Sequence, residues 1–224
     1  MDLHTDNLLG FLGTFGRQDE RNVLTLNVLL LGDRQSGRSS VGNALIGGDG
    51  FQTGICISGD AVTTKHRLLC RNFQRFFRRQ GAESDLTLRV VDTPPMLLPR
   101  PHSVHELCPE GVHVLVFVAR ADLPHDNTRL EEQTLFGPGW RRHALLVVTH
   151  ADHLEEAGLH PSDYLTQTSD WLRALAEEAG GGVSFVDNSR DWPSIRGRPL
   201  RDRLLRLSAE NHHRALTVRT EVSL

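Results

Sequence analysis

The sequence predicts an α/β domain with a mainly parallel sheet and helices on both of its faces. Apolar runs of strand length alternate with helical stretches along the 224 residues. These runs are almost continuously apolar, which is typical of parallel strands that are covered on both sides. The length suits one domain with short extensions. We place that domain at residues 22–216, between an N-terminal tail (1–21) and a C-terminal tail (217–224).

The expected elements follow from the position of the apolar runs and of the residues that end them. We expect strands at Val23–Leu31, Leu86–Val91, Val112–Ala119, Ala144–Val148 and Val183–Val186, and helices at Ser39–Ile46, Asn127–Phe136, Ser162–Ala179 and Leu200–Leu216. The glycines at 180–182 are a strong signal for the end of the third of these helices. An edge strand around Cys70 and a turn at Gln80–Ser84 complete the pattern.

Composition excludes several classes of protein. The formal net charge of −3 argues against a dedicated nucleic-acid-binding protein, although all basic residues except Lys65 and the histidines are arginines. Three widely spaced cysteines, Cys56, Cys70 and Cys108, fit neither a disulfide framework nor a zinc site, and reduced thiols predict a cytoplasmic location. No apolar run reaches the roughly 20 residues of a membrane span, so we expect no integral membrane anchor. The N-terminus lacks the basic start of a signal peptide.

The strongest functional signal is a glycine-rich loop between the first strand and the first helix. The loop reads GDRQSGRSS and meets the spacing G-x-x-x-x-G-[K]-[ST] of a phosphate-binding P-loop. In such a loop, backbone amides and the following helix start surround a phosphate, and the last motif hydroxyl binds Mg²⁺. The predicted nucleotide-binding residues here are Gly32, Asp33, Arg34, Gln35, Ser36, Gly37, Arg38, Ser39 and Ser40, with Ser39 also on the metal. The alternative is a loop that only joins a strand to a helix.

Two residues depart from the pattern of an active nucleotide hydrolase. Arg38 stands where the loop lysine is expected, and an arginine is bulkier and forked rather than a compact charge. Further along, VVDTPP places Asp92 at a strand end, where P-loop proteins hold Mg²⁺ with a carboxylate. In the corresponding D-x-x-G motif the glycine amide contacts the γ-phosphate, but Pro95 has no amide hydrogen.

Two later strand ends carry residues suited to a purine base. In VVTHAD, the flat ring of His150 can lie against the base, and Asp152 can accept hydrogen bonds from guanine. In FVDNS, Asn188 follows the last strand and can contact the same base. His150 also has the simpler interpretation of an exposed loop histidine. The order of the four loops is more informative than any one of them, because ligands of open α/β sheets bind at the carboxyl ends of the strands.

Together these segments resemble the immunity-associated GTPases (GIMAP, or AIG-type G domains), which are relatives of the septins and of the Toc GTPases of chloroplast import. The resemblance runs from Asn27 to Asn188 and is closest to short, single-domain members. Its segments are NVLLLGDRQSGRSSVGNALIG, AVTTKH, VVDTPP, CPEGVHVLVFVARADL, FGPGWRRHALLVVTHADHLEEAG and FVDNS. The most family-specific parts are VGNALIG and PEGVHVLVFV.

The resemblance implies a P-loop NTPase fold that binds GTP or GDP with Mg²⁺ as cofactor. It assigns Thr63 or Thr64 as the switch threonine on the metal, and Thr149, His150 and Asp152 as the base-specificity loop. It also implies a monomer that pairs, at most, as a nucleotide-dependent homodimer. We assign no catalytic residue. Met96 and its neighbours offer nothing like a water-orienting glutamine, but the family often lacks one.

Three alternatives remain open at this stage. The first is an active GTPase switch, and the second is a pseudo-GTPase that acts through protein contacts. The third is an ATP-using P-loop enzyme, against which the carboxylate of Asp152 argues. The arginines of 71–79, which are interleaved with phenylalanines, form either a partner-binding patch or the outward face of an edge strand.

Overall fold

The structure is a computed structural model that describes residues 22–51, 53, 66–79, 82–94, 101–123, 135–187 and 193–217. The expected residues Thr63, Thr64, Pro95 and Asn188 lie outside the described residues. So does most of the helix expected at 127–136, of which only the last two residues are described.

The order of the elements confirms an α/β chain. The strands are β1 (Asn22–Gly32), β2 (Arg67–Arg79), β3 (Ala82–Asp92), β4 (Val114–Arg120), β5 (Ala144–Thr149) and β6 (Val183–Val186). The helices are α1 (Arg38–Ile46), α2 (Pro101–Leu107), α4 (Asp152–Glu156), α5 (Pro161–Gln167), α6 (Asp170–Glu178) and α7 (Pro193–Glu210), with a 3₁₀ turn η1 at Trp140–His143. In the described part of the chain, no helix is both long and apolar enough to cross a membrane.

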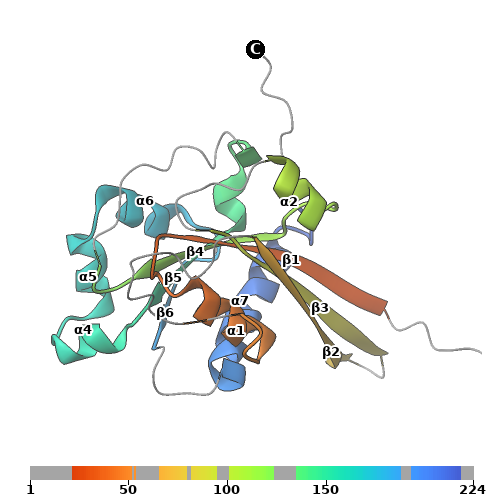
Figure 1. Cartoon of the computed structure of the whole chain (residues 1–224), viewed down its shortest axis with the longest axis horizontal. Helices are drawn as coiled ribbons and strands as arrows, with labels where there is room; N and C mark the ends of the chain where they lie inside the picture. The colour runs from red at the N-terminus through yellow and green to blue at the C-terminus, as the bar shows by residue number, and fades with distance from the viewer. Residues whose placement is uncertain are drawn as a thin grey trace, which may run out of the picture.

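The six strands form one sheet in the order β2-β3-β1-β4-β5-β6 (Figure 1). Only the β2–β3 pair is antiparallel, and the other neighbours run parallel. The central strand β1 pairs with β3 and β4 at once, so that Val28 lies opposite both Val90 and Val114. The predicted fold class is therefore confirmed.

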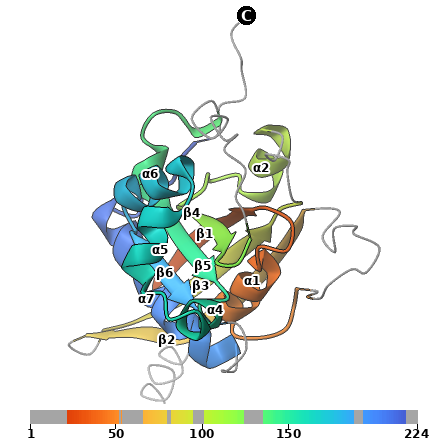
Figure 2. The same cartoon turned by 90° about the vertical axis from the view of Figure 1, so that its left-hand side faces the viewer.

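The sheet separates two apolar cores, because successive side chains of a strand point to opposite faces. Leu26, Val28 and Leu30 of β1 pack toward α1 and α7, whereas Leu29 and Leu31 pack on the other face. Figure 1 shows α1 and α7 on one side of the sheet and α2 and α6 on the other. Figure 2 shows α4, α5 and α6 side by side next to β5 and β6.

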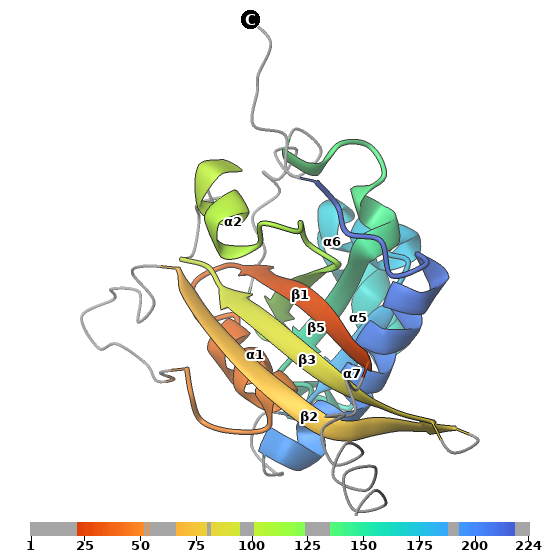
Figure 3. The same cartoon turned by 90° about the vertical axis from the view of Figure 1, so that its right-hand side faces the viewer.

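The antiparallel hairpin β2–β3 is longer than the sequence predicts and forms one edge of the sheet (Figure 3). Its register shifts between Phe73 and Phe77, and Arg75 within this bulge has a φ of 52°. The amide of Arg75 donates to Oδ1 of the buried Asp85 at 2.7 Å. Bulges of this kind protect an edge strand from pairing with another chain.

Two of the expected helices differ in the structure. The helix expected at Ser162–Ala179 is broken into α5 and α6, because Thr168 is extended and the Ser169 hydroxyl accepts a hydrogen bond from the Leu172 amide as an N-cap. The last helix was expected at Leu200–Leu216, but α7 begins at Pro193 and ends at Glu210. Leu216 instead forms an isolated antiparallel bridge with Val112.

Buried histidines lie at the amino ends of the parallel strands, the edge opposite the phosphate loop. The Asn27 amide donates to Nδ1 of His113 at 3.0 Å, and the His113 amide donates to the Asn27 carbonyl at 2.9 Å. The ring of His143 contacts the His113 carbonyl oxygen through Nδ1 at 3.0 Å. Since Nδ1 of His113 accepts a hydrogen bond, protonation of this ring would break the contact with β1.

We expect the free energy of unfolding to fall as the pH drops below about 6.5. Burial is the main reason that the pKa of His113 is lowered, with His143 and His213 adding to the shift and Glu110 opposing it. A lowered folded-state pKa means that the unfolded chain takes up the proton first, so the stabilisation exists above the unfolded pKa and is lost in acid. His113→Asn keeps an acceptor near Nδ1 and cannot titrate, so urea unfolding of this variant should depend less on pH. Equal pH dependence in both proteins would contradict this role of His113.

Candidate functional site

The predicted site residues that the structure describes lie at the carboxyl ends of the parallel strands or in the loops that follow these ends. β1 ends at Gly32, β3 at Asp92, β4 at Arg120, β5 at Thr149, and all are neighbours within the same sheet. The loops that follow these ends form the site, as expected for an open α/β sheet.

The shape of the phosphate loop depends on a close approach of the backbone at Gly32 and on left-handed backbone conformations further along the loop. A Cβ on Gly32 would lie 2.5 Å from the Val118 carbonyl oxygen and 2.6 Å from Oγ of Ser36. Gln35 and Gly37 have φ values of 58° and 88°, so the loop turns through left-handed conformations before α1 begins. The N-cap residue of α1 is Gly37, which has no side chain with which to cap the helix. α1 begins directly after this loop, and the positive end of a helix suits an anion.

A hydroxyl and a carboxylate come together beside this loop. Oγ of Ser39 donates to Oδ2 of Asp92 at 2.6 Å, and Asp92 is only 1% exposed. Oxygen donors of this kind suit Mg²⁺, which usually takes one or two protein ligands and completes its shell with water and phosphate. Ser39 and Asp92 thus fit a magnesium ion, whereas Thr63, the third expected ligand, lies outside the described residues.

Arg38 does not extend into solvent from the phosphate loop. Its side chain is 6% exposed, and Nη1 donates both to the Thr93 carbonyl oxygen and, at 3.2 Å, to Oγ1 of Thr93. Thr93 is itself buried, and its hydroxyl donates to the Leu30 carbonyl at 2.8 Å. The loop arginine therefore contacts the end of β3, a contact that the sequence did not indicate.

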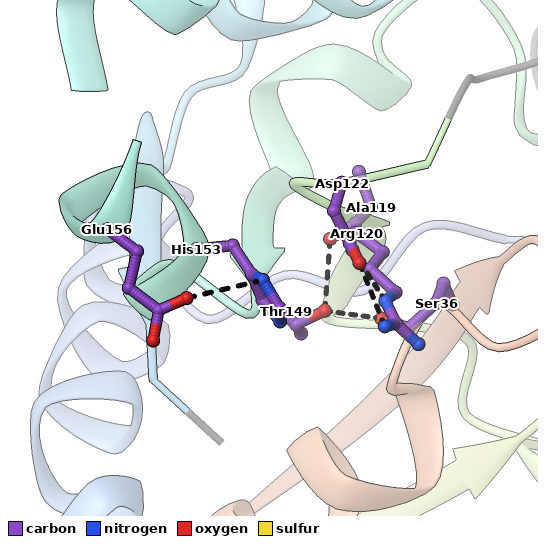
Figure 4. Close-up of polar contacts among 7 residues, drawn as sticks. All are labelled: Ser36, Ala119, Arg120, Asp122, Thr149, His153 and Glu156. Carbon is purple, nitrogen blue, oxygen red and sulfur yellow. Dashed lines mark hydrogen bonds and ion pairs between the residues drawn. The ribbon is translucent and has the colours of Figure 1, made fainter. Parts of the chain in front are cut away.

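Thr149 links the phosphate loop to the predicted base-specificity loop of residues 149–152, called the base loop below (Figure 4). It is fully buried, and its hydroxyl lies 2.7 Å from the Ser36 carbonyl oxygen and 3.3 Å from that of Ala119. The base loop is held on its other side by the Ala151 amide, which donates to the Val186 carbonyl at 3.2 Å. Thr149 is part of the expected base-specificity loop, and its hydroxyl positions this loop against the phosphate loop.

His150 and Asp152 follow in the same loop with different environments. His150 has a φ of 55° and is partly buried, and this burial is the main cause that lowers its pKa, with the positive charge of Arg120 second. A neutral imidazole is the form that suits contact with a purine face. Oδ1 of Asp152 is buried and accepts no hydrogen bond from any described residue. Such a carboxylate oxygen is costly unless a ligand donates to it.

Arg120 and Asp122 form an ion pair that the sequence analysis did not single out (Figure 4), and the charges of both residues act on His150. Nε and Nη2 of Arg120 lie 2.6 and 2.9 Å from the two carboxylate oxygens of Asp122. The hydrogen bond from Arg120 is the main cause that lowers the pKa of Asp122. The only sequence signal for this pair was the position of Arg120 at the end of an apolar strand.

His66, just before β2, is a second residue that the sequence analysis missed. Burial lowers its pKa, and the negative charge of Asp92 acts in the opposite direction. His66 thus lies within electrostatic reach of the carboxylate that fits Mg²⁺.

The arginines of β2 have structural partners. Arg75 and Arg78 both pair with Glu83 of β3, at 3.1 and 2.7 Å. Nη1 of Arg71 donates to the Gly47 carbonyl at the end of α1, and its guanidinium lies 5.3 Å from the centre of the Phe73 ring. These contacts favour the edge-strand interpretation over the partner-binding patch.

Comparison with known proteins identifies a family and a fold. The family model named AIG1 matches residues 26–195, which is most of the chain. Among solved structures, Toc33 from Arabidopsis thaliana in complex with GDP and Mg²⁺ is 19% identical, with 88% of each chain covered and a TM-score of 0.54.

Two further solved structures of Toc proteins resemble this chain to a similar degree. A dimerization-deficient mutant of Arabidopsis thaliana Toc33 is 19% identical over 87% of this chain and 88% of its own, with a TM-score of 0.52. A structure of the chloroplast translocon components atToc33 and psToc159, in which dimerization is described as important for GTPase activity, is 19% identical over 83% and 84%, with a TM-score of 0.50. At this identity the likeness shows the fold alone.

Proposed function

The chain belongs to the AIG1 family, and from this premise we propose that it is a guanine-nucleotide-binding G domain of the immunity-associated (GIMAP) type. In this proposal the protein binds GTP or GDP together with Mg²⁺ and hydrolyses GTP weakly or not at all. The observation that carries it is the meeting of the phosphate loop, the Ser39–Asp92 pair and the base loop at one edge of the sheet.

The phosphates have suitable donors in the loop. The start of α1 and the loop glycines suit the β-phosphate, and Ser39 and Asp92 would hold Mg²⁺. When bound, Mg²⁺ would neutralise phosphate charge. The solved Toc33 structure with GDP and Mg²⁺ supports this ligand pair for the fold.

The base loop supports guanine over adenine. Guanine presents N–H donors where adenine presents none, and the buried Oδ1 of Asp152 is an acceptor without a donor among the described residues. His150 would lie against the ring, and Asn188 would add a second base contact.

Weak hydrolysis follows from the γ-phosphate side of the site. Pro95 cannot donate the amide hydrogen that the D-x-x-G glycine supplies, and Arg38 is occupied with Thr93. The competing proposals are an active GTPase switch and a pseudo-GTPase that acts only through protein contacts.

Base preference tests the proposal most directly. We expect nucleotide-stripped protein to bind GDP at least about tenfold more tightly than ADP in isothermal titration with Mg²⁺. A tenfold ratio corresponds to the binding free energy of one lost polar contact. Asp152→Ala should remove this preference. Glu177→Ala, an exposed acidic residue on α6 with the same change in charge, is the control and should retain it. Equal binding of GDP and ADP by the native protein would exclude a guanine-specific site.

GTP turnover separates the active switch from the proposed weak hydrolase. We expect phosphate release no faster than about 10⁻³ per second, the scale of unassisted small GTPases. Pro95→Gly should increase the affinity for GTP more than for GDP, since it restores one amide donor. Brisk hydrolysis by the native protein would favour the active switch, and no binding of any nucleotide would favour the pseudo-GTPase.

We also propose that any pairing of two copies of the chain requires bound nucleotide. The solved Toc relatives are described in terms of dimerization, which supports this expectation for the fold. Light scattering should give a monomer for the stripped protein and an increased mass only with GDP or GTPγS. A dimer without nucleotide would count against the proposal.

A further inference from the structure

We propose that Arg38 is a tether between the phosphate loop and the end of β3 that makes the site select a nucleoside diphosphate over a triphosphate. The inference rests on the proposed function and specifies which form of the nucleotide the site prefers. It assigns to Arg38 a role that differs from that of the lysine usual at this position, which reaches toward the β- and γ-phosphates.

The contacts of Arg38 define the tether. Nη1 donates to both the carbonyl oxygen and Oγ1 of Thr93, the residue immediately after β3. The stem of Arg38 passes over Gly32, where its Cδ lies 3.1 Å from the position of a Cβ on that glycine. With 6% of its surface exposed, the side chain lies within the loop rather than in solvent.

The environment of Thr93 makes this tether costly to release. Thr93 is 1% exposed, and its hydroxyl is already hydrogen-bonded to the Leu30 carbonyl in β1. If Arg38 turned away, the buried Thr93 carbonyl would lose a charged donor, and a buried acceptor without a donor is unfavourable. The Ser39–Asp92 hydrogen bond lies next to it, so the loop and β3 are joined at two adjacent points.

The number of phosphates decides whether the tether must be broken. A diphosphate ends at the β-phosphate, for which the glycine loop and the start of α1 provide amides, so it leaves the Arg38–Thr93 contact intact. A third phosphate adds negative charge that the lysine of the usual loop also meets, whereas the basic side chain here is held at Thr93. A triphosphate therefore gains less binding free energy than it would in a lysine-containing loop, because a contact of Arg38 with the γ-phosphate would replace the existing contact of Arg38 with Thr93.

The test compares Arg38→Lys with the native protein in two measurements. Lysine keeps the charge but lacks the fork of the guanidinium, so the nucleotide-free variant should melt about 3–8 °C lower. Isothermal titration with GDP and GTPγS should show that the native protein binds GDP more tightly than GTPγS. In the variant the affinity ratio should shift toward GTPγS by about tenfold. Arg206→Lys, an exposed arginine of α7, is the matched control and should change neither measurement.

Each outcome has a defined meaning. An unchanged melting temperature in Arg38→Lys overturns the tether. A lower melting temperature with an unchanged ratio of GDP to GTPγS affinity shows that the contact is merely structural, and this result overturns the proposed selection of the diphosphate. If the variant does not fold, the native protein decides alone: GTPγS binding that is as tight as GDP binding, or tighter, overturns the proposal. Failure of the native protein to bind GDP at all would overturn the proposed function, whereas the melting measurement reports on the tether independently.

Discussion

The site depends on the lack of a side chain at Gly32. At this position the chain leaves β1 so close to β4 that a Cβ would lie 2.5 Å from the Val118 carbonyl oxygen. β1 cannot move to make room, because it is paired on both sides and packed on both faces. Gly32 thus allows the loop to turn back over the strand ends and gives the stem of Arg38 its path toward Thr93. The shape of the candidate nucleotide-binding edge is therefore a consequence of how β1 ends.

The two ends of the parallel strands have different kinds of polar contact. At the carboxyl ends, Ser39, Asp92 and Thr149 connect loops to one another, and these contacts hold groups that suit a metal and phosphates. At the amino ends, Asn27 and His113 hold β1 against the segment before β4. Functional groups on loops at one edge of a rigid sheet are the usual arrangement in α/β proteins, since the sheet fixes the loop ends while the loops remain adaptable.

The high arginine content has a structural explanation in part of the chain. Nη1 of Arg201, which is 8% exposed, donates to the carbonyl oxygens of Ala44 and Leu45, and Arg71 donates to that of Gly47. Both guanidiniums lie near the ring of Phe73, at 5.0 and 5.3 Å. Arginines from β2 and α7 thus provide the last carbonyls of α1 with donors and place positive charge at the negative end of that helix. The same helix begins at the phosphate loop, so these contacts help to hold it in place.

The sequence by itself determined the fold class, the parallel strands and the position of the phosphate loop, because apolar periodicity and glycine spacing are local properties of the chain. It also placed Ser39, Asp92 and Asp152 at one edge, since strand ends meet there in any parallel sheet.

Local patterns did not reveal the break at Thr168–Ser169, where a capping hydroxyl interrupts an otherwise continuous apolar repeat. Only the tertiary structure decided that Thr149 binds the Ser36 carbonyl and that Arg38 binds Thr93. These partners are 113 and 55 residues apart in the sequence, and no local pattern encodes which buried carbonyl a distant donor will meet.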